Sequence, residues 1–195
     1  MAIKIGLTGG IGSGKSVVSH LLKTMGIPVY IADDESKRIT STDAFIKQQL
    51  INLLGDEVYI NGVLNKNLLA AYIFSDAEHA KIVNEIIHPR VKEDFVKWAA
   101  KHTKHTVVAI ESAILIEAGF TDEVDIVAMV YAPMDLRLQR LALRDSSSSK
   151  EQILKRIQSQ MDDEKKKALA DIIIVNDEQI PVIPQVVELV KSSQQ

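Results

Sequence analysis

Gly9-Gly10-Ile11-Gly12-Ser13-Gly14-Lys15-Ser16 follows an apolar run over residues 3–8 and precedes a helical pattern. The octet has the form G-x-x-x-x-G-K-[ST], in which glycines let successive backbone N–H groups turn toward an anion. The lysine can reach the β- and γ-phosphates, and the serine hydroxyl can hold Mg²⁺. The positive end of the following helix points at the same phosphates. The stretch therefore predicts a nucleoside triphosphate site, without deciding where the phosphoryl group goes.

The composition is that of one compact globular domain. The 195 residues are 46% hydrophobic and 25% charged, and the net charge of −3 gives no basic field for nucleic acid. Cysteine is absent, which fits a reducing compartment. No apolar run approaches the roughly 18 residues of a membrane span, and the N-terminus lacks the charged region of a signal peptide. We expect a cytoplasmic protein with no membrane partner.

Strand-like and helical patterns alternate along most of the chain. Five apolar runs read as strands, at about 3–8, 27–31, 105–110, 125–131 and 171–175. Their alternation with helices predicts an α/β fold, a five-stranded parallel sheet with helices on both faces. The block at about 42–104 is helical and too long for a simple crossover, so it predicts an inserted helical subdomain. The core then comprises about 1–41, 105–136 and 168–195.

Asp33 follows the second predicted strand. Ligands of parallel sheets lie beyond the carboxyl ends of the strands, where the phosphate loop and Glu111 also fall. Transfer of a phosphoryl group to a hydroxyl needs a carboxylate that orients the acceptor and takes its proton. Asp33 is placed for that role. It could equally cap the following helix, as Asp34 or Ser36 could.

Arginines are concentrated in one part of the chain. Four of the six fall between 137 and 156, and Arg137, Arg140 and Arg144 share one helix face. The stripe precedes Ser146–Ser149 and predicts a lid, at about 137–167, that carries guanidinium groups over phosphates and excludes water. The alternative is a solvated helix face paired with Asp135 and Asp145.

Other polar residues carry weaker indications. His88 and Arg90, in the step His88-Pro89-Arg90, could contact substrate groups, although a single histidine is more often structural. We expect Lys165–Lys167 to form a solvated helix face and Trp98 to serve packing. The histidines lack metal-ligand spacing, so no structural metal held by the protein is expected.

These motifs together resemble the dephospho-coenzyme A kinase family, over nearly the whole chain. The resemblance rests on Thr8-Gly9-Gly10-Ile11-Gly12-Ser13-Gly14-Lys15-Ser16, Ala32-Asp33, Gly62-x-Leu64, Ile87-His88-Pro89, Ile114-Leu115-Ile116-Glu117, Arg140-Leu141-x-x-Arg144, Gln160, Lys165, Ala170-Asp171 and Asn176. It implies ATP- and Mg²⁺-dependent phosphorylation of the ribose 3′-hydroxyl of dephospho-coenzyme A. It also implies that the helical subdomain at about 42–104 helps to hold this acceptor.

The resemblance assigns roles to individual residues. Asp33 is the implied general base, and Lys15 and Arg140 stabilise the transferring phosphoryl group. The implied nucleotide-binding residues are Gly10, Ile11, Gly12, Ser13, Gly14, Lys15, Ser16, Val17, Arg144 and Asn176, with Ser16 also on the metal and Asn176 near the adenine. The implied acceptor-side residues are Thr8, Asp33, His88 and Glu117.

The chain departs from the family pattern at several positions. Ile31 replaces the first aspartate of a D-A-D step, and Ala113 replaces a proline. Arg137 stands where glutamine is usual, Val17 where threonine is usual, and Glu178 where glycine is common. These departures concern the acceptor pocket and the adenine-side loop.

Two other functions are consistent with the phosphate loop. A different small-molecule kinase, such as a nucleoside monophosphate kinase, would share the loop and the lid. A nucleotide-dependent switch usually carries N-K-x-D and D-x-x-G, but Asn65-Lys66-Asn67 is followed by Leu68. The sequence makes no prediction of oligomeric state.

Overall fold

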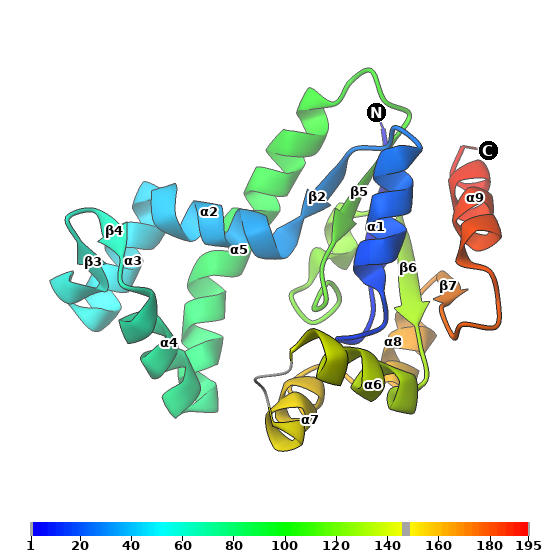
Figure 1. The fold of residues 1–195 in the computed structure, drawn as a ribbon. Coiled ribbons are helices and arrows are strands. Elements are labelled where there is room, and N and C mark those ends of the chain that lie inside the picture. Colours follow the sequence, from blue (N-terminus) through cyan, green and yellow to red (C-terminus); the bar gives the residue numbers. More distant parts are fainter. Residues whose placement is uncertain (1, 146–148, 195) are drawn as a thin grey trace. The chain divides into compact units, whose positions relative to one another are not determined.

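The computed structural model describes residues 2–145 and 149–194. The chain divides into two compact units (Figure 1). The first, here called the sheet unit, combines Met1–Ile31 with Trp98–Gln195, and the second, the helical unit, is Ala32–Lys97. Each unit is described by itself.

The sheet unit is built on a parallel sheet, as the alternating pattern predicts. Its strands are β1 (Ile3–Thr8), β2 (Val29–Ile31), β5 (Val107–Glu111), β6 (Ile126–Tyr131) and β7 (Ile172–Val175), in the order β2-β5-β1-β6-β7. All four pairings are parallel. Leu7 lies opposite Glu111 on one side and Ala128 on the other. The phosphate loop therefore leaves the middle of the sheet, at the edge where the neighbouring strands also end.

Two strands begin later than the hydrophobic pattern predicts. β2 starts at Val29, because the Ile27 N–H donates to Leu22 O at the end of the preceding helix, 3.0 Å away. Pro28 has no N–H for the ladder, although its carbonyl accepts from Ala109 N at 2.9 Å. β5 runs from Val107 and includes Glu111 as its last residue.

Helices cover both faces of the sheet. On one face, α1 (Lys15–Thr24) and α9 (Val182–Ser192) contribute Leu22 and Leu189 to the core that contains Leu7. A side chain at position 6 would face the opposite side of the sheet, because side chains alternate along a strand. A Cβ on Gly6 would lie 2.8 Å from Leu115 Cδ1, so a larger residue there would displace the buried Leu115 side chain.

Further helices complete the sheet unit. They are η2 (Phe120–Glu123), α6 (Met134–Arg144), α7 (Lys150–Gln158) and α8 (Asp163–Leu169). α8 packs against β6. Trp98 lies edge-on to Tyr30, with ring centroids 5.5 Å apart, which confirms its role in packing.

The helical unit consists of helices and one small hairpin. Its elements are α2 (Ala32–Thr42), α3 (Ala44–Leu54), η1 (Asp56–Val58), β3 (Tyr59–Ile60), β4 (Val63–Leu64), α4 (Lys66–Ser75) and α5 (Ala77–Lys101), whose last turn belongs to the sheet unit. The interruptions in the helical pattern have local causes. Gly55 ends α3, and Asn61-Gly62 forms the turn between β3 and β4 with both φ angles positive.

Helix starts in the helical unit follow from capping side chains. Asp43 Oδ1 accepts from Ile46 N at 2.9 Å, and Asn65 Oδ1 accepts from Leu68 N at 3.2 Å. Within the described part of the chain, no helix is both long enough and apolar enough to cross a membrane.

Candidate active site

The phosphate loop has a backbone that only glycine accommodates at three positions. Gly9, Gly12 and Gly14 have φ angles of 141°, 83° and 94°. A Cβ on Gly9 would lie 2.2 Å from Val130 O, and one on Gly14 would lie 2.1 Å from Asn176 Nδ2. The loop thus runs tightly against the ends of β6 and β7, and any side chain at these glycines would push it outward.

Three buried polar atoms around the loop have no hydrogen-bond partner among the described residues. They are Thr8 Oγ1, Ser13 Oγ and Arg140 Nη1. Thr8 is completely buried and Ser13 is 1% exposed. A buried polar group without a partner is costly. These atoms therefore fit a ligand that carries both hydrogen-bond acceptors and donors, as a hydrated polyphosphate does.

Lys15 is folded back over the loop. Its Nζ donates to Gly9 O at 2.9 Å and lies 3.4 Å from Gly10 O. Ser16 and Val17 lie beside it in the first turn of α1 and are exposed. An ammonium over the cradle and a hydroxyl at the helix start are the groups that phosphates and a magnesium ion require.

Arg140 and Asn176 meet at the side of the loop. Arg140 Nη2 donates to Asn176 O at 3.2 Å and to Glu178 Oε1 at 3.1 Å. Asn176 Nδ2 donates to Ser13 O at 2.8 Å. Arg140 Nη1 is 4.0 Å from the position that a Cβ on Gly14 would take. Glu178 holds this contact with a φ of 68°, a conformation that favours glycine.

The three arginines of α6 do not share one environment. Arg137 is 2% exposed, so a solvated face is wrong for it. Its partners are Ile11 O and Asp163, not Asp135 or Asp145. Arg144 is exposed. A period of three or four residues places side chains on one face but does not show what packs against each.

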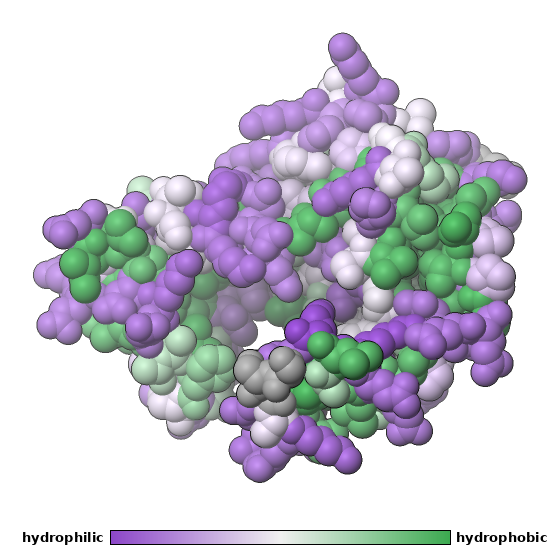
Figure 2. All heavy atoms as spheres, in the orientation of Figure 1, coloured by the Kyte–Doolittle hydropathy of each residue, from purple (hydrophilic) through white to green (hydrophobic). Residues whose placement is uncertain are grey.

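The predicted lid has a surface of mixed character. Figure 2 shows hydrophilic and hydrophobic residues interspersed over the α6 and α7 region. Ser149 caps α7 by accepting from Gln152 N at 3.2 Å. The other three serines of the Ser146–Ser149 tract, residues 146–148, lie outside the described residues.

Glu111 is an acid that the sequence placed at a strand end without a role. Its carboxylate Oε2 accepts a hydrogen bond from the Ser19 hydroxyl on α1, and Ser19 is 2% exposed. β5 is the neighbour of β1, so Glu111 stands at the same sheet edge as the phosphate loop. The sequence offered one clue, namely that Glu111 stands at the end of a predicted strand. Only the order of the strands in the sheet shows that this strand lies next to β1.

Glu117 belongs to a buried ion pair. Its Oε1 lies 2.9 Å from Lys166 Nζ and accepts from Met161 N at 2.9 Å. Lys166 is 0% exposed and also donates to Ala113 O at 2.6 Å. The prediction of a solvated face over 165–167 is therefore wrong for Lys166, because β6 covers that side of α8.

Two predicted acceptor-side residues lie in the helical unit. Asp33 is exposed in the first turn of α2, two residues after β2 ends. His88 is half-buried in α5. Burial lowers the pKa of His88 from its ordinary value, and the charge of Lys92 adds to that. The imidazole is therefore favoured in its neutral form, which can donate one hydrogen bond and accept another.

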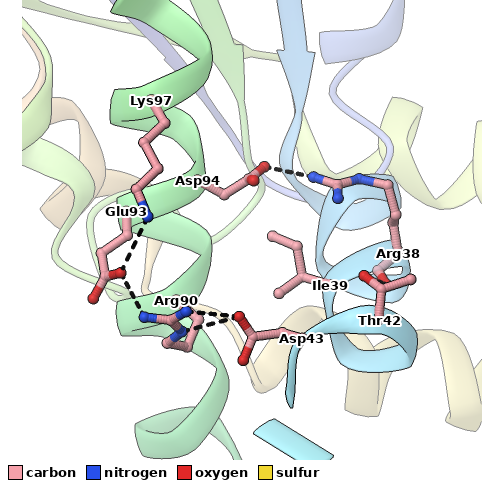
Figure 3. A pocket seen from close by; sticks show the side chains of 8 residues that line it. All are labelled: Arg38, Ile39, Thr42, Asp43, Arg90, Glu93, Asp94 and Lys97. Atoms are coloured by element: carbon pink, nitrogen blue, oxygen red, sulfur yellow. Dashed lines mark hydrogen bonds and ion pairs between the residues drawn. The ribbon is translucent and has the colours of Figure 1, made fainter. Parts of the chain in front are cut away.

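Arg90 lines a cavity of about 110 Å³ within the helical unit (Figure 3). Its Nη2 lies 2.7 Å from Asp43 Oδ2, and its Nη1 lies 2.5 Å from Glu93 Oε2. Asp94 accepts from Arg38 Nη2 across the same cavity at 2.6 Å. The guanidinium of Arg90 is thus already balanced by carboxylates. No group of three or more metal-ligating side chains occurs among the residues that the structure describes.

The geometry brings the predicted residues together only in part. Thr8, the loop from Gly10 to Val17, Arg140 and Asn176 converge in the sheet unit. Arg144 is exposed on α6. Asp33 and His88 belong to the helical unit.

Comparisons with known proteins bear on the family of the chain. The family model described as dephospho-CoA kinase matches residues 3–181. A dephospho-CoA kinase of Bacteroides fragilis is 56% identical over 97% of this chain and 92% of its own length. That of Porphyromonas gingivalis is 41% identical over 97% and 94%.

Solved structures share the fold. TT1252 of Thermus thermophilus superposes with a TM-score of 0.84 at 29% identity, covering 100% of this chain and 98% of its own. A shikimate kinase of Acinetobacter baumannii has a TM-score of 0.56 at 16% identity, covering 98% and 93%, which shows a common fold alone. With the family model spanning most of its length and a relative of more than half identity, the chain belongs to the dephospho-CoA kinase family.

Proposed function

We propose that the chain transfers the γ-phosphoryl group of ATP to the ribose 3′-hydroxyl of dephospho-coenzyme A, giving coenzyme A and ADP. Membership of the family supports the reaction. The observation that carries the donor half is the phosphate loop with its three unpartnered buried atoms, on Thr8, Ser13 and Arg140. This reaction is the last step of coenzyme A biosynthesis.

ATP and Mg²⁺ fit the residues of the loop. The N–H groups of Gly12, Gly14, Lys15 and Ser16, at and just before the N-terminus of α1, hold phosphate oxygens. Ser16 holds the metal ion, which when bound offsets charge on the β- and γ-phosphates. Lys15 exchanges its contacts with Gly9 O and Gly10 O for phosphate oxygens. An ammonium is attracted more strongly by an anionic phosphate oxygen than by a neutral carbonyl, so the exchange favours the bound state.

Arg140 and Asn176 complete the donor side. Arg140 presents Nη1 toward the loop while Nη2 stays on Asn176 O and Glu178. The guanidinium then stabilises charge that develops on the transferring group. Asn176 uses its amide nitrogen on Ser13 O, so we assign its amide oxygen to the adenine amino group. We assign Arg144 to nucleotide binding, at the open side of the nucleotide.

Asp33 acts as the general base on the acceptor hydroxyl. It is exposed in the first turn of α2, where its carboxylate oxygens can accept the proton of the acceptor hydroxyl. His88, favoured as neutral imidazole, donates a hydrogen bond to the acceptor. Thr8 lines the acceptor side. Glu117 is held by Lys166, so we assign its second oxygen to the acceptor.

The parts of the chain have corresponding roles. The inserted helical region, predicted at about 42–104, binds the acceptor, and the segment at about 137–167 closes over the donor phosphates. The core supplies the sheet and the phosphate loop. These roles follow from the resemblance to the family.

A coupled assay of ADP release across acceptors tests the reaction. We expect release that depends on dephospho-coenzyme A and is absent with AMP, CMP or shikimate. Shikimate is included because a shikimate kinase shares the fold. Equal or faster release with one of these acceptors would identify a different small-molecule kinase. Release that needs no acceptor would favour a nucleotide-dependent switch.

Lys15→Ala tests the donor site. The substitution removes the ammonium over the cradle, and we expect turnover to fall by about 10²-fold or more, the scale of one lost electrostatic donor. Lys23→Ala, at the other end of α1, is the matched control, with no expected effect. Normal turnover in the Lys15 variant would exclude the loop as the donor site.

A further inference from the structure

Arg137 is the most deeply buried arginine in the described chain, and it does not point into solvent or into the open side of the loop. It is 2% exposed, and its Nε donates to Ile11 O at 2.8 Å. Its guanidinium lies against Gly10, where a Cβ would be 2.3 Å from Cζ. The side chain therefore spans from α6 to the first turn of the phosphate loop. Gly10 is small because the guanidinium occupies the space beside it.

The same residue of the loop is also held through its N–H. Ile11 N donates to Gln160 Oε1 at 2.9 Å, from the segment between α7 and α8. Both polar groups of Ile11 are thus bonded to residues that follow β6, so they are engaged before any nucleotide binds. The turn is closed locally by Ser13 N, which donates to Gly10 O at 3.1 Å. The cradle that phosphates enter is shaped by these contacts.

Asp163 fixes Arg137 from α8. Its carboxylate pairs with Arg137 Nη1, and Asp163 itself is 19% exposed. Taking both charges out of water is costly, and an apolar pair of similar volume would fold as well or better. A buried pair of this kind is best explained by the geometry that it imposes. Here that geometry is the position of the Ile11 peptide.

We propose that Arg137 is a positioning residue for the phosphate loop and not a phosphate ligand. Together with Gln160 it holds the Ile11 peptide, and Asp163 holds Arg137. Phosphate affinity of the loop therefore depends on α6 and α8, which contain no phosphate ligand themselves at these positions. The inference rests on the proposed function in one respect, namely that the loop binds the phosphates of the donor nucleotide.

The test compares the binding of ADP with that of adenosine. Adenosine lacks phosphates, so the ratio of the two dissociation constants isolates the contribution of the loop. For Arg137→Gln and for Gln160→Ala we expect ADP to bind about three- to tenfold more weakly, the scale of one lost hydrogen bond, with adenosine unchanged. Arg156→Gln is the matched control, because Arg156 forms an exposed ion pair with Asp145 in the same segment. We expect its ratio to equal that of the wild type.

Asp163→Ala separates positioning from direct binding. A phosphate ligand freed from its carboxylate would bind ADP more tightly, whereas a positioning residue that loses its anchor lowers ADP affinity. We expect the loss. Tighter ADP binding in this variant would overturn the inference, as would an unchanged ratio in Gln160→Ala.

The experiment distinguishes a loss of folded protein from a loss of phosphate binding. Gln160 is only half-buried, so its variant decides the matter if Arg137→Gln does not fold. Equal weakening of ADP and adenosine would show a loss of folded protein and would also count against the inference. Nucleotide binding needs no acceptor. A wild-type protein that binds ADP but does not phosphorylate dephospho-coenzyme A would fail the proposed function and leave this inference standing.

Discussion

Two ion pairs of the sheet unit differ from two of the helical unit in burial and in what they hold. In the sheet unit, the cationic side chains of Arg137 and Lys166 are 2% and 0% exposed. In the helical unit, those of Arg38 and Lys97 are 51% and 69% exposed. Residues of the same type thus occupy opposite environments in two parts of one chain.

The two buried cations also donate hydrogen bonds to backbone carbonyls, which the exposed cations do not require. Arg137 donates to Ile11 O, and Lys166 donates to Ala113 O. Arg38 and Arg90 bond to carboxylates across the cavity of Figure 3. A buried charge requires several partners to offset its desolvation. Arg137 and Lys166 therefore use their charge to fix loops, whereas Arg38 carries its charge on an exposed surface.

Removing a buried cation should have the largest effect on stability. Lys166→Met keeps the volume but removes the ammonium that pairs with Glu117 and donates to Ala113 O, and we expect the unfolding free energy to fall by about 3 kcal/mol. Denaturant unfolding measures the change. Lys165→Met, the exposed neighbour on α8, should change it by less than about 0.5 kcal/mol. Similar losses in both variants would end the distinction between buried and exposed charges.

An exposed carboxylate of the helical unit should matter for turnover alone. We expect Asp33→Asn to lower kcat by about 10²-fold, because the base is lost, while ATP binding and the melting temperature stay near those of the wild type. Asp34→Asn is the matched control, an exposed acid that pairs with Lys37 at 3.0 Å. Its turnover should be unchanged. Undiminished turnover in the Asp33 variant would remove Asp33 from the mechanism.

Substitutions of Asp43 should have an effect on stability of intermediate size, since Asp43 is both a helix cap and an ion-pair partner. Asp43→Ala should cost about 1 kcal/mol, the usual scale of a lost cap. Asp43→Asn should cost less, because asparagine also caps helices. Urea unfolding at neutral pH measures both. Equal losses would mean that the charge on Asp43, and not its capping bond to Ile46 N, carries the stabilisation.

The pH dependence of Asp43 follows from its partners. The hydrogen bond from Arg90 holds the pKa of the Asp43 carboxyl below its ordinary value. The stabilisation is therefore present above the unfolded pKa of about 4 and is lost as pH falls through the lower folded pKa. The stability difference between wild type and Asp43→Asn should shrink over that range. A difference that is constant with pH would contradict the assignment.

The smallest effect is expected at an exposed cation, Arg38. Arg38→Gln removes contacts to Glu35 and Asp94, and we expect a loss below about 1 kcal/mol that declines as salt is added. Thermal unfolding at low and high salt measures it. A larger loss that salt does not reduce would show that this cavity, like the sheet unit, depends on its charges.

Sequence reasoning was most successful where the decisive interactions are local. The strands, their parallel arrangement and the phosphate loop follow from apolar runs and glycine spacing. It was less successful at boundaries, such as the start of β2, where a single hydrogen bond from Ile27 N decides. It also left Glu111 without a role, because the order of strands is not written in any one segment.

The sequence by itself determined the loop, since Gly9, Gly12 and Gly14 are required by their own backbone angles. Tertiary structure alone decided the environment of Arg137. Its helical period marks it as a polar surface residue, yet its partners lie 126 residues earlier, at Ile11, and 26 residues later, at Asp163. Burial is a property of what packs against a side chain, and that packing exists only once distant segments have met.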